Sequence, residues 1–347
     1  MGGAAGAHAA SAATATATIT ALLPPATSLA RCQSQAAAAR RSPPSLAAEA
    51  LAALQVAEPD EALLAAAWDR TARQLQGSPQ PRQQAAGLMM NRPSPSVASP
   101  VASLPAPALA SLVSLALASA DPTVLQWATG ACSAPGAQAA CQGLSARAWV
   151  QAEPDNLLAW LPLLAQEPQA KEEALRGVAQ ARRADGGWMR WATVVNAARP
   201  GDLAPDLRFA FAMHLTSLAV SEPMPAWHGV LVACNGDALA DARRHGQCGQ
   251  IAQLMVDQGR ELTTVFLGYA IGKRLGWPPE REQAHQALKA AARQAGPGLW
   301  LPGVTLDCNA QLHEHWLAQV DQLGEVGLAR QRLRSVATAA SAVQTPP

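Results

Sequence analysis

The chain of 347 residues has few aromatic residues and no long run of one charge. Aromatic residues make up 4% of it, with one Tyr and three Phe against ten Trp, and charged residues make up 15%. Its 26 basic and 25 acidic residues nearly balance, and no run of Lys or Arg exceeds two residues. Proteins that bind nucleic acid normally carry a basic patch. The composition therefore argues against nucleic acid as a partner.

Long hydrophobic runs and strand patterns are also missing. No uninterrupted apolar stretch reaches the ~20 residues that a membrane-spanning helix needs, so we expect no transmembrane segment. No segment shows the period-two alternation of β-branched residues that predicts a strand. Hydrophobic residues nevertheless make up 49% of the chain, and many are alanines, which favour helix and close helix packing. The sequence predicts an all-α fold.

Short apolar segments with helical spacing follow one another over residues 108–340. Turn residues separate them, as at Asp121-Pro122, Glu153-Pro154 and Gly186-Gly187. Helices joined by short turns pair with their neighbours as antiparallel hairpins. We therefore predict stacked antiparallel helical hairpins that form either a solenoid or a curved helical bundle.

Composition divides the chain into five parts. Residues 1–44, rich in Ala, Ser, Thr and Pro, predict an export signal or disordered leader. Residues 45–76 predict a helical hairpin with helices over 46–56 and 60–76. Residues 77–107 contain seven prolines and predict a linker or long loop. The hairpin array over 108–340 follows, and residues 341–347 predict a disordered tail.

The N-terminal segment has only some features of a signal peptide. Residues 1–30 contain no Lys, Arg, Asp or Glu, and Ser28 and Ala30 are small residues that suit a cleavage site. The positively charged n-region is missing, however, and the Ala/Thr stretch is a weak hydrophobic region. The segment favours a periplasmic or secreted protein, and a cytoplasmic protein is the alternative.

Residues 154–187 resemble one degenerate tetratricopeptide (TPR-like) repeat. The resemblance lies in Pro154-Asp155-Asn156, Ala159-Trp160, Leu163-Leu164, Glu173-Ala174 and Ala181, and it covers about a tenth of the chain. It implies a helix-turn-helix unit and a surface that binds a protein or peptide partner. It implies no catalytic residue.

Six cysteines are the most informative polar feature, and four of them form two close pairs. On one straight helix Cys132 and Cys141 would lie ~13 Å apart, too far for a disulfide. A turn at Pro135-Gly136 would bring them together, and turns around residues 235–246 would do the same for Cys234 and Cys248. Two disulfides would indicate an oxidising compartment. The alternative is buried free thiols in a cytosolic protein.

Two other arrangements indicate an enzyme. His245 lies three residues before Cys248, so the pair would share a helical face as a thiol nucleophile and base. Cys308, His313 and His315 carry metal-ligating atoms, although two helical histidines two residues apart point in different directions.

No motif in the chain indicates a cofactor, and no residue is assigned a catalytic or metal-binding role. The leading prediction is an exported, non-enzymatic helical scaffold of the bacterial envelope that binds a protein or peptide. The alternative is a hydrolase that uses Cys248 with His245, or a metal bound near residues 308–315.

Overall fold

The computed structural model describes residues 26–39, 60–93, 103–134, 136–187, 189–221, 225–295, 301 and 304–343. These residues form 15 α-helices, and no strand occurs among them. This confirms the all-α fold class. No helix in the described ranges is both long and apolar enough to cross a membrane.

The helices follow one another with short connections. They are α2 (Ala26–Ala39), α4 (Glu61–Gln76), α5 (Pro81–Met89), α6 (Ala106–Ser119), α7 (Pro122–Cys132), α8 (Ala146–Ala152), α9 (Leu157–Gln166), α10 (Lys171–Gln180), α11 (Arg190–Ala198), α12 (Pro205–Val220), α13 (His228–Ala233), α14 (Ala242–Gln258), α15 (Leu262–Arg274), α16 (Pro279–Ala295) and α17 (Leu306–Val343). Two short 3-10 helices, Pro168–Ala170 and Gly236–Ala240, precede α10 and α14.

Local capping explains several helix starts. A capping oxygen accepts a hydrogen bond from a backbone N–H in the first turn, which otherwise has no partner within the helix. Five side chains do this: Asp60, Asp121, Ser145, Asn156 and Asp241. These starts are therefore encoded by residues next to the helix itself.

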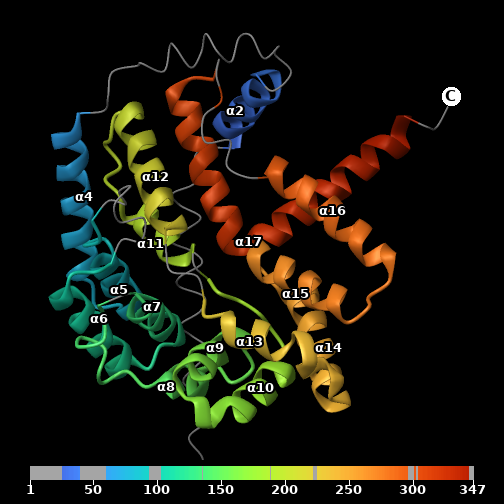
Figure 1. The fold of residues 1–347 in the computed structure, drawn as a ribbon. Helices are drawn as coiled ribbons and strands as arrows, with labels where there is room; N and C mark the ends of the chain where they lie inside the picture. The colour runs from blue at the N-terminus through green and yellow to red at the C-terminus, as the bar shows by residue number, and fades with distance from the viewer. Residues whose placement is uncertain are drawn as a thin grey trace, which may run out of the picture.

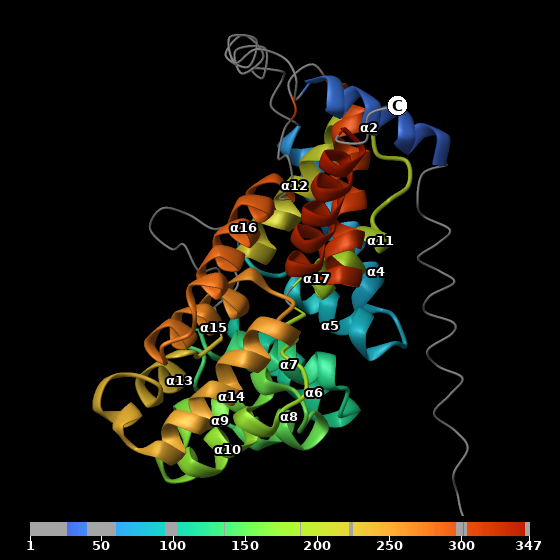
Figure 2. The ribbon, with the colours of Figure 1, turned by 90° about the vertical axis from the view of Figure 1, so that its right-hand side faces the viewer.

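The helices are arranged as a closed circuit (Figure 1). From α4 to α10 each helix packs against the next, and the path continues through α14, α15, α16 and α17. The circuit closes because α17 packs against α12, α12 packs against α4, and α11 packs against α4 and α5. Figure 2 shows α12 and α17 together at one end and α8, α9 and α10 at the other.

An extended stretch, residues 181–187, crosses the interior of this circuit, and we call it the central segment. Its Arg183 carbonyl accepts a hydrogen bond from Leu157 N at 2.9 Å, at the start of α9. Its Ala184 carbonyl accepts from Arg260 N at 3.2 Å, and the Arg260 carbonyl accepts from Val326 N at 3.0 Å. The central segment thus connects α9, the α14–α15 turn and α17 through backbone hydrogen bonds.

Helices α9 and α10 pack against each other as a helical hairpin, within the stretch that resembles a tetratricopeptide repeat. The Trp160 ring lies directly against Gly177, where a Cβ atom would overlap it. The Trp160 indole also donates to the Pro154 carbonyl at 2.9 Å. Trp160 therefore fixes the packing of this hairpin.

The structure differs from the sequence predictions at several elements. The linker predicted over 77–107 is wrong for residues 81–89, which form α5. Pro81 starts that helix, where a missing N–H costs nothing. Within the array predicted over 108–340, residues 138–143 form turns, and α8 begins only at Ala146. Helix α17 consists of two helical stretches that meet at Gly324, whose backbone is not helical (φ 71°).

The predicted leader also contains structure. Residues 26–39 form α2, which packs against α17, and Cys32 in α2 is disulfide-bonded to Cys308. Residues 1–25, the helix predicted over 46–56 and residues 344–347 of the predicted tail lie outside the described residues.

Candidate functional site

A cavity of about 870 Å³ lies inside the circuit of helices. Its wall is formed by α7, α8, α9, the end of α12, the segment before α13, the start of α15 and one residue of α17. Ligand-binding cavities in proteins typically measure ≈ 300–1,000 Å³ and are mostly apolar, with a few polar groups. This cavity has the size of a ligand site.

Much of the wall is apolar. Trp127, Trp149 and Trp227 contribute to it, together with Leu158 and Leu161 on α9. The Trp149 indole donates to Glu153 at 2.9 Å. The indole nitrogens of Trp127 and Trp227 have no hydrogen-bond partner among the described residues, although these side chains are only 2% and 5% exposed. Buried donors without partners are uncommon in folded proteins.

Glu261 and Glu325 form a polar part of the same wall. One oxygen of Glu261, Oε1, accepts hydrogen bonds from Gly186 N at 2.6 Å and Gly187 N at 3.0 Å. Oε2 of Glu325 accepts from Leu262 N at 3.0 Å. Among the described residues, neither carboxylate is within ion-pair distance of a cationic side chain.

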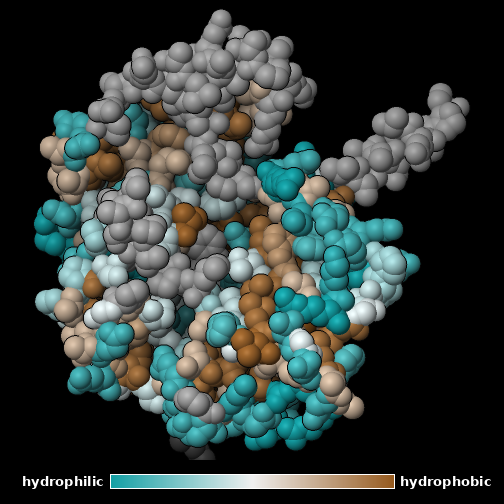
Figure 3. Space-filling model, viewed as in Figure 1, coloured by the Kyte–Doolittle hydropathy of each residue, from teal (hydrophilic) through white to brown (hydrophobic). Residues whose placement is uncertain are grey.

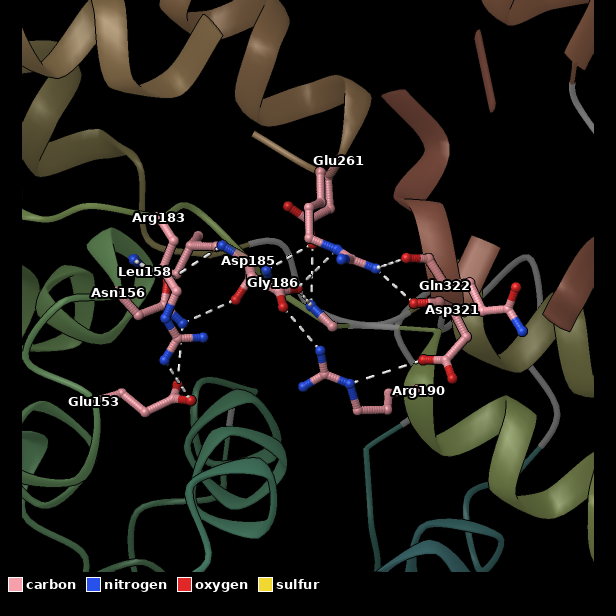
Figure 4. A network of polar contacts seen from close by, with 12 residues as sticks. Glu153, Asn156, Leu158, Arg183, Asp185, Gly186, Arg190, Glu261, Asp321 and Gln322 are labelled. Carbon is pink, nitrogen blue, oxygen red and sulfur yellow. Dashed lines mark hydrogen bonds and ion pairs between the residues drawn. The ribbon is translucent and has the colours of Figure 1, made fainter. Parts of the chain in front are cut away.

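The guanidinium groups of Arg190 and Arg260 next to the central segment are paired with other groups (Figure 4). Arg190 pairs with Asp185 at 2.8 Å and with Asp321 at 3.8 Å, and Arg260 lies 3.5 Å from Asp185. Arg260 also donates to the carbonyls of Asp321 and Gln322. The cluster thus contains two guanidinium groups and four carboxylates, those of Asp185, Glu261, Asp321 and Glu325.

Burial and neighbouring charge act on Glu261 in the same direction. Burial, with a smaller contribution from the carboxylates of Asp185 and Glu325, raises the pKa of Glu261 to about 7 against the opposing effect of the backbone hydrogen bonds. Burial likewise raises the pKa of Glu325. The ionisation of Glu261 therefore changes within the physiological pH range.

The four cysteines with close spacing are bonded in the two pairs that their spacing predicts. Cys132 is bonded to Cys141 and Cys234 to Cys248, with Cα atoms 5.9 and 5.6 Å apart. A third disulfide joins Cys32 to Cys308. Cys132 and Cys141 belong to the cavity wall, so their disulfide shapes the cavity directly.

The proposed thiol nucleophile is wrong for this structure. Cys248 is fully buried and its sulfur is bonded to Cys234, so it offers no thiolate. His245 lies in the first turn of α14 and is exposed. The Cys248/His245 form of the hydrolase hypothesis therefore lacks its nucleophile.

The region from Cys308 to His315 has a structural role. Cys308 is bonded to Cys32. His313 is 3% exposed, with Nε2 2.6 Å from the Thr216 hydroxyl on α12. Glu314 pairs with Arg199 at 2.7 Å and Arg208 at 3.0 Å. These contacts join α17 to α12 and to the end of α11, and no group of three or more His, Cys, Asp or Glu among the described residues is placed to hold a metal ion.

Sequence reasoning singled out Cys132 and Cys141 of the cavity wall but missed Glu261 and Glu325. The contacts of Glu261 with Gly186 and Gly187 span 75 and 74 residues, and that of Glu325 with Leu262 spans 63. The spacing of residues within a short stretch of sequence does not indicate contacts between residues so far apart. The one sequence feature that could have pointed to this site is Glu261, an acidic residue directly before the apolar segment of α15.

Comparisons were made with protein-family models, with curated proteins and with solved structures, and none of them finds a match to this chain. The functional argument therefore rests on the chain's own residues and their geometry.

Proposed function

We propose that the protein is an exported, non-enzymatic binding protein of the bacterial envelope that holds a short peptide in its central cavity. The observation that carries this proposal is the cavity itself, with about 870 Å³ of space inside a closed circuit of helices. A rigid helical wall limits the structural change that accompanies binding, which favours affinity.

The chemistry of the wall supports a peptide as the occupant. The tryptophan and leucine side chains provide apolar contact area, which contributes most of the binding energy at such sites. The TPR-like hairpin supplies Leu158 and Leu161 to the wall, and a tetratricopeptide resemblance also implies peptide binding.

The three disulfides support export. Disulfides persist in oxidising compartments such as the periplasm and are uncommon in the cytosol. A signal-peptidase cut after Ala30 would remove the first residues of α2 but leave Cys32 in the mature chain, so the Cys32–Cys308 disulfide could still form.

A cavity-filling variant tests the binding function. Gly130 lies on α7 in the cavity wall, and a Cβ atom added there meets nothing within 4 Å. The side chain of Gly130→Phe would therefore start in open space at the cavity wall, and we expect its ring to occupy part of the cavity. Gly246 on α14 is exposed and also has open space around it, so Gly246→Phe is the matched control.

The measurement uses a synthetic library of short peptides with acetylated and amidated ends, passed over immobilised protein and identified by mass spectrometry. We expect the natural chain and Gly246→Phe to retain the same apolar peptides, and Gly130→Phe to bind them at least about tenfold more weakly, a loss of about 1.4 kcal/mol. Circular dichroism checks that both variants are folded. Equal retention by all three proteins, or no retention by any, would overturn the proposal.

A further inference from the structure

We infer that the peptide carries a positively charged side chain, which binds against Glu261 and Glu325 in the cavity wall. This inference rests on the proposed function and specifies its ligand. It follows from the charge balance of the wall, from the free oxygen atoms of the two glutamates and from their position at the cavity.

The charge balance is the first step. Around the central segment, Arg190 and Arg260 face four carboxylates, and the closest ion pairs of both arginines are with Asp185 and Asp321. Glu261 and Glu325 are left without a cationic partner among the described residues. A carboxylate removed from bulk water without a counter-charge is unfavourable, and a cation supplied by the ligand would offset that cost.

The free acceptor atoms are the second step. Oε1 of Glu325 accepts no hydrogen bond from a described residue, and Oε2 of Glu261 has only the Thr264 hydroxyl at 3.4 Å. Both glutamates belong to the cavity wall and are half-buried. These oxygens are therefore available to a donor inside the cavity, and a lysine or arginine side chain supplies several N–H donors at once.

The wall as a whole matches this kind of ligand independently of the carboxylates. Leu158, Leu161 and Trp149 provide an apolar surface. The complementary ligand combines apolar side chains with one cation, whereas an acidic peptide would meet repulsion at Glu261 and Glu325.

The test uses the same peptide library with the double variant Glu261→Gln/Glu325→Gln. Glutamine has nearly the same shape as glutamate and still accepts the hydrogen bonds of Gly186, Gly187 and Leu262. Glu280→Gln is the control, because Glu280 is exposed on α16 and does not belong to the cavity wall. Retention is measured at pH 8, where Glu261 is mostly ionised.

We expect the natural chain and Glu280→Gln to enrich apolar peptides that contain Lys or Arg at least about tenfold over otherwise identical peptides with Gln, a difference of about 1.4 kcal/mol. The double variant should retain apolar peptides but lose this preference. Apolar peptides retained by the natural chain without a preference for Lys or Arg would overturn the inference and leave the proposed function intact. No retention at all would overturn the proposed function itself.

Discussion

Two titratable residues with shifted pKa values, Glu261 and His313, affect stability in opposite directions. Burial raises the pKa of Glu261 to about 7, whereas burial lowers the pKa of His313 to about 4. Between the ordinary carboxylate pKa and about pH 7 the folded state holds a proton on Glu261 that the unfolded state releases, so rising pH reduces stability through this group. Between about pH 4 and the ordinary histidine pKa the unfolded state holds the extra proton on His313, so falling pH reduces stability there.

Glu261→Gln isolates the first of these effects. Above pH 7 the ionised carboxylate opposes folding, and the pKa of about 7 corresponds to about 3 kcal/mol. We expect the variant to be more stable than the natural chain by up to about 3 kcal/mol at pH 8 and equally stable at pH 4. Urea unfolding at both pH values measures the difference. His313 is present in both proteins and cancels from the comparison.

Glu280→Gln serves again as the control and should leave the free energy of unfolding unchanged at both pH values. A gain in stability for Glu261→Gln that is the same at pH 4 and pH 8 would contradict the expected origin of the effect, because only ionisation depends on pH.

At the scale of single elements, α2 has few contacts with the rest of the described structure. Its main packing partner is α17, and Cys32 belongs to a small separate cluster with Val304 and Cys308. A polar contact links Ser28 to Gln311 at 3.1 Å. A helix of this length is marginal in water on its own, so we attribute the order of α2 largely to the Cys32–Cys308 disulfide.

Removing that disulfide should release α2 alone. In Cys32→Ala/Cys308→Ala we expect hydrogen exchange of residues 26–39 to approach that of an unstructured peptide, because local opening then requires only the loss of a small contact. Exchange in α9 and α10 should stay unchanged. Hydrogen exchange followed by mass spectrometry measures both regions in one experiment.

The matched comparison is Cys132→Ala/Cys141→Ala, in which we expect faster exchange around residues 132–145 and no change in α2. Unchanged protection of α2 after removal of the Cys32–Cys308 disulfide would show that packing on α17 is sufficient to hold it.

The elements also show what the sequence predicts and why. Helix starts at Asp60 and Asp121 depend on adjacent residues and were predicted closely. The pairings of Cys132 with Cys141 and Cys234 with Cys248 span 9 and 14 residues and follow from turn chemistry. The Cys32–Cys308 disulfide spans 276 residues, and nothing near either cysteine specifies the partner.

The candidate site likewise depends on contacts between residues far apart in the sequence. Helix α5 was missed because the proline-rich segment around it predicts a loop. Pro81 lies at the first position of the helix, where proline is tolerated. The cavity depends on closure of the circuit, in which α12 and α17 return to the first helices. Periodicity along the chain identifies helices but does not determine which distant helices pack together, so neither the cavity nor the Glu261–Glu325 pair could be predicted.

On the scale of the whole molecule, the three disulfides serve different parts of the circuit. Cys32–Cys308 joins the N-terminal helix α2 to α17, Cys132–Cys141 shapes the cavity wall, and Cys234–Cys248 joins the end of α13 to α14.

Figure 3 shows hydrophilic residues over much of the surface near α14 and α16, with hydrophobic residues gathered near α13 and α15.

The proposed export predicts both the mass of the protein and the state of its thiols. We expect protein produced in a bacterium with its own N-terminus to be recovered from the periplasm with a mass that lacks about the first 30 residues. An alkylating reagent should modify none of its thiols before reduction, and all the cysteines that remain after reduction, including Cys32. Intact-mass spectrometry before and after reduction measures cleavage and thiol state together. A full-length mass with freely alkylated thiols would contradict export, because the disulfides would then not have formed where the protein resides.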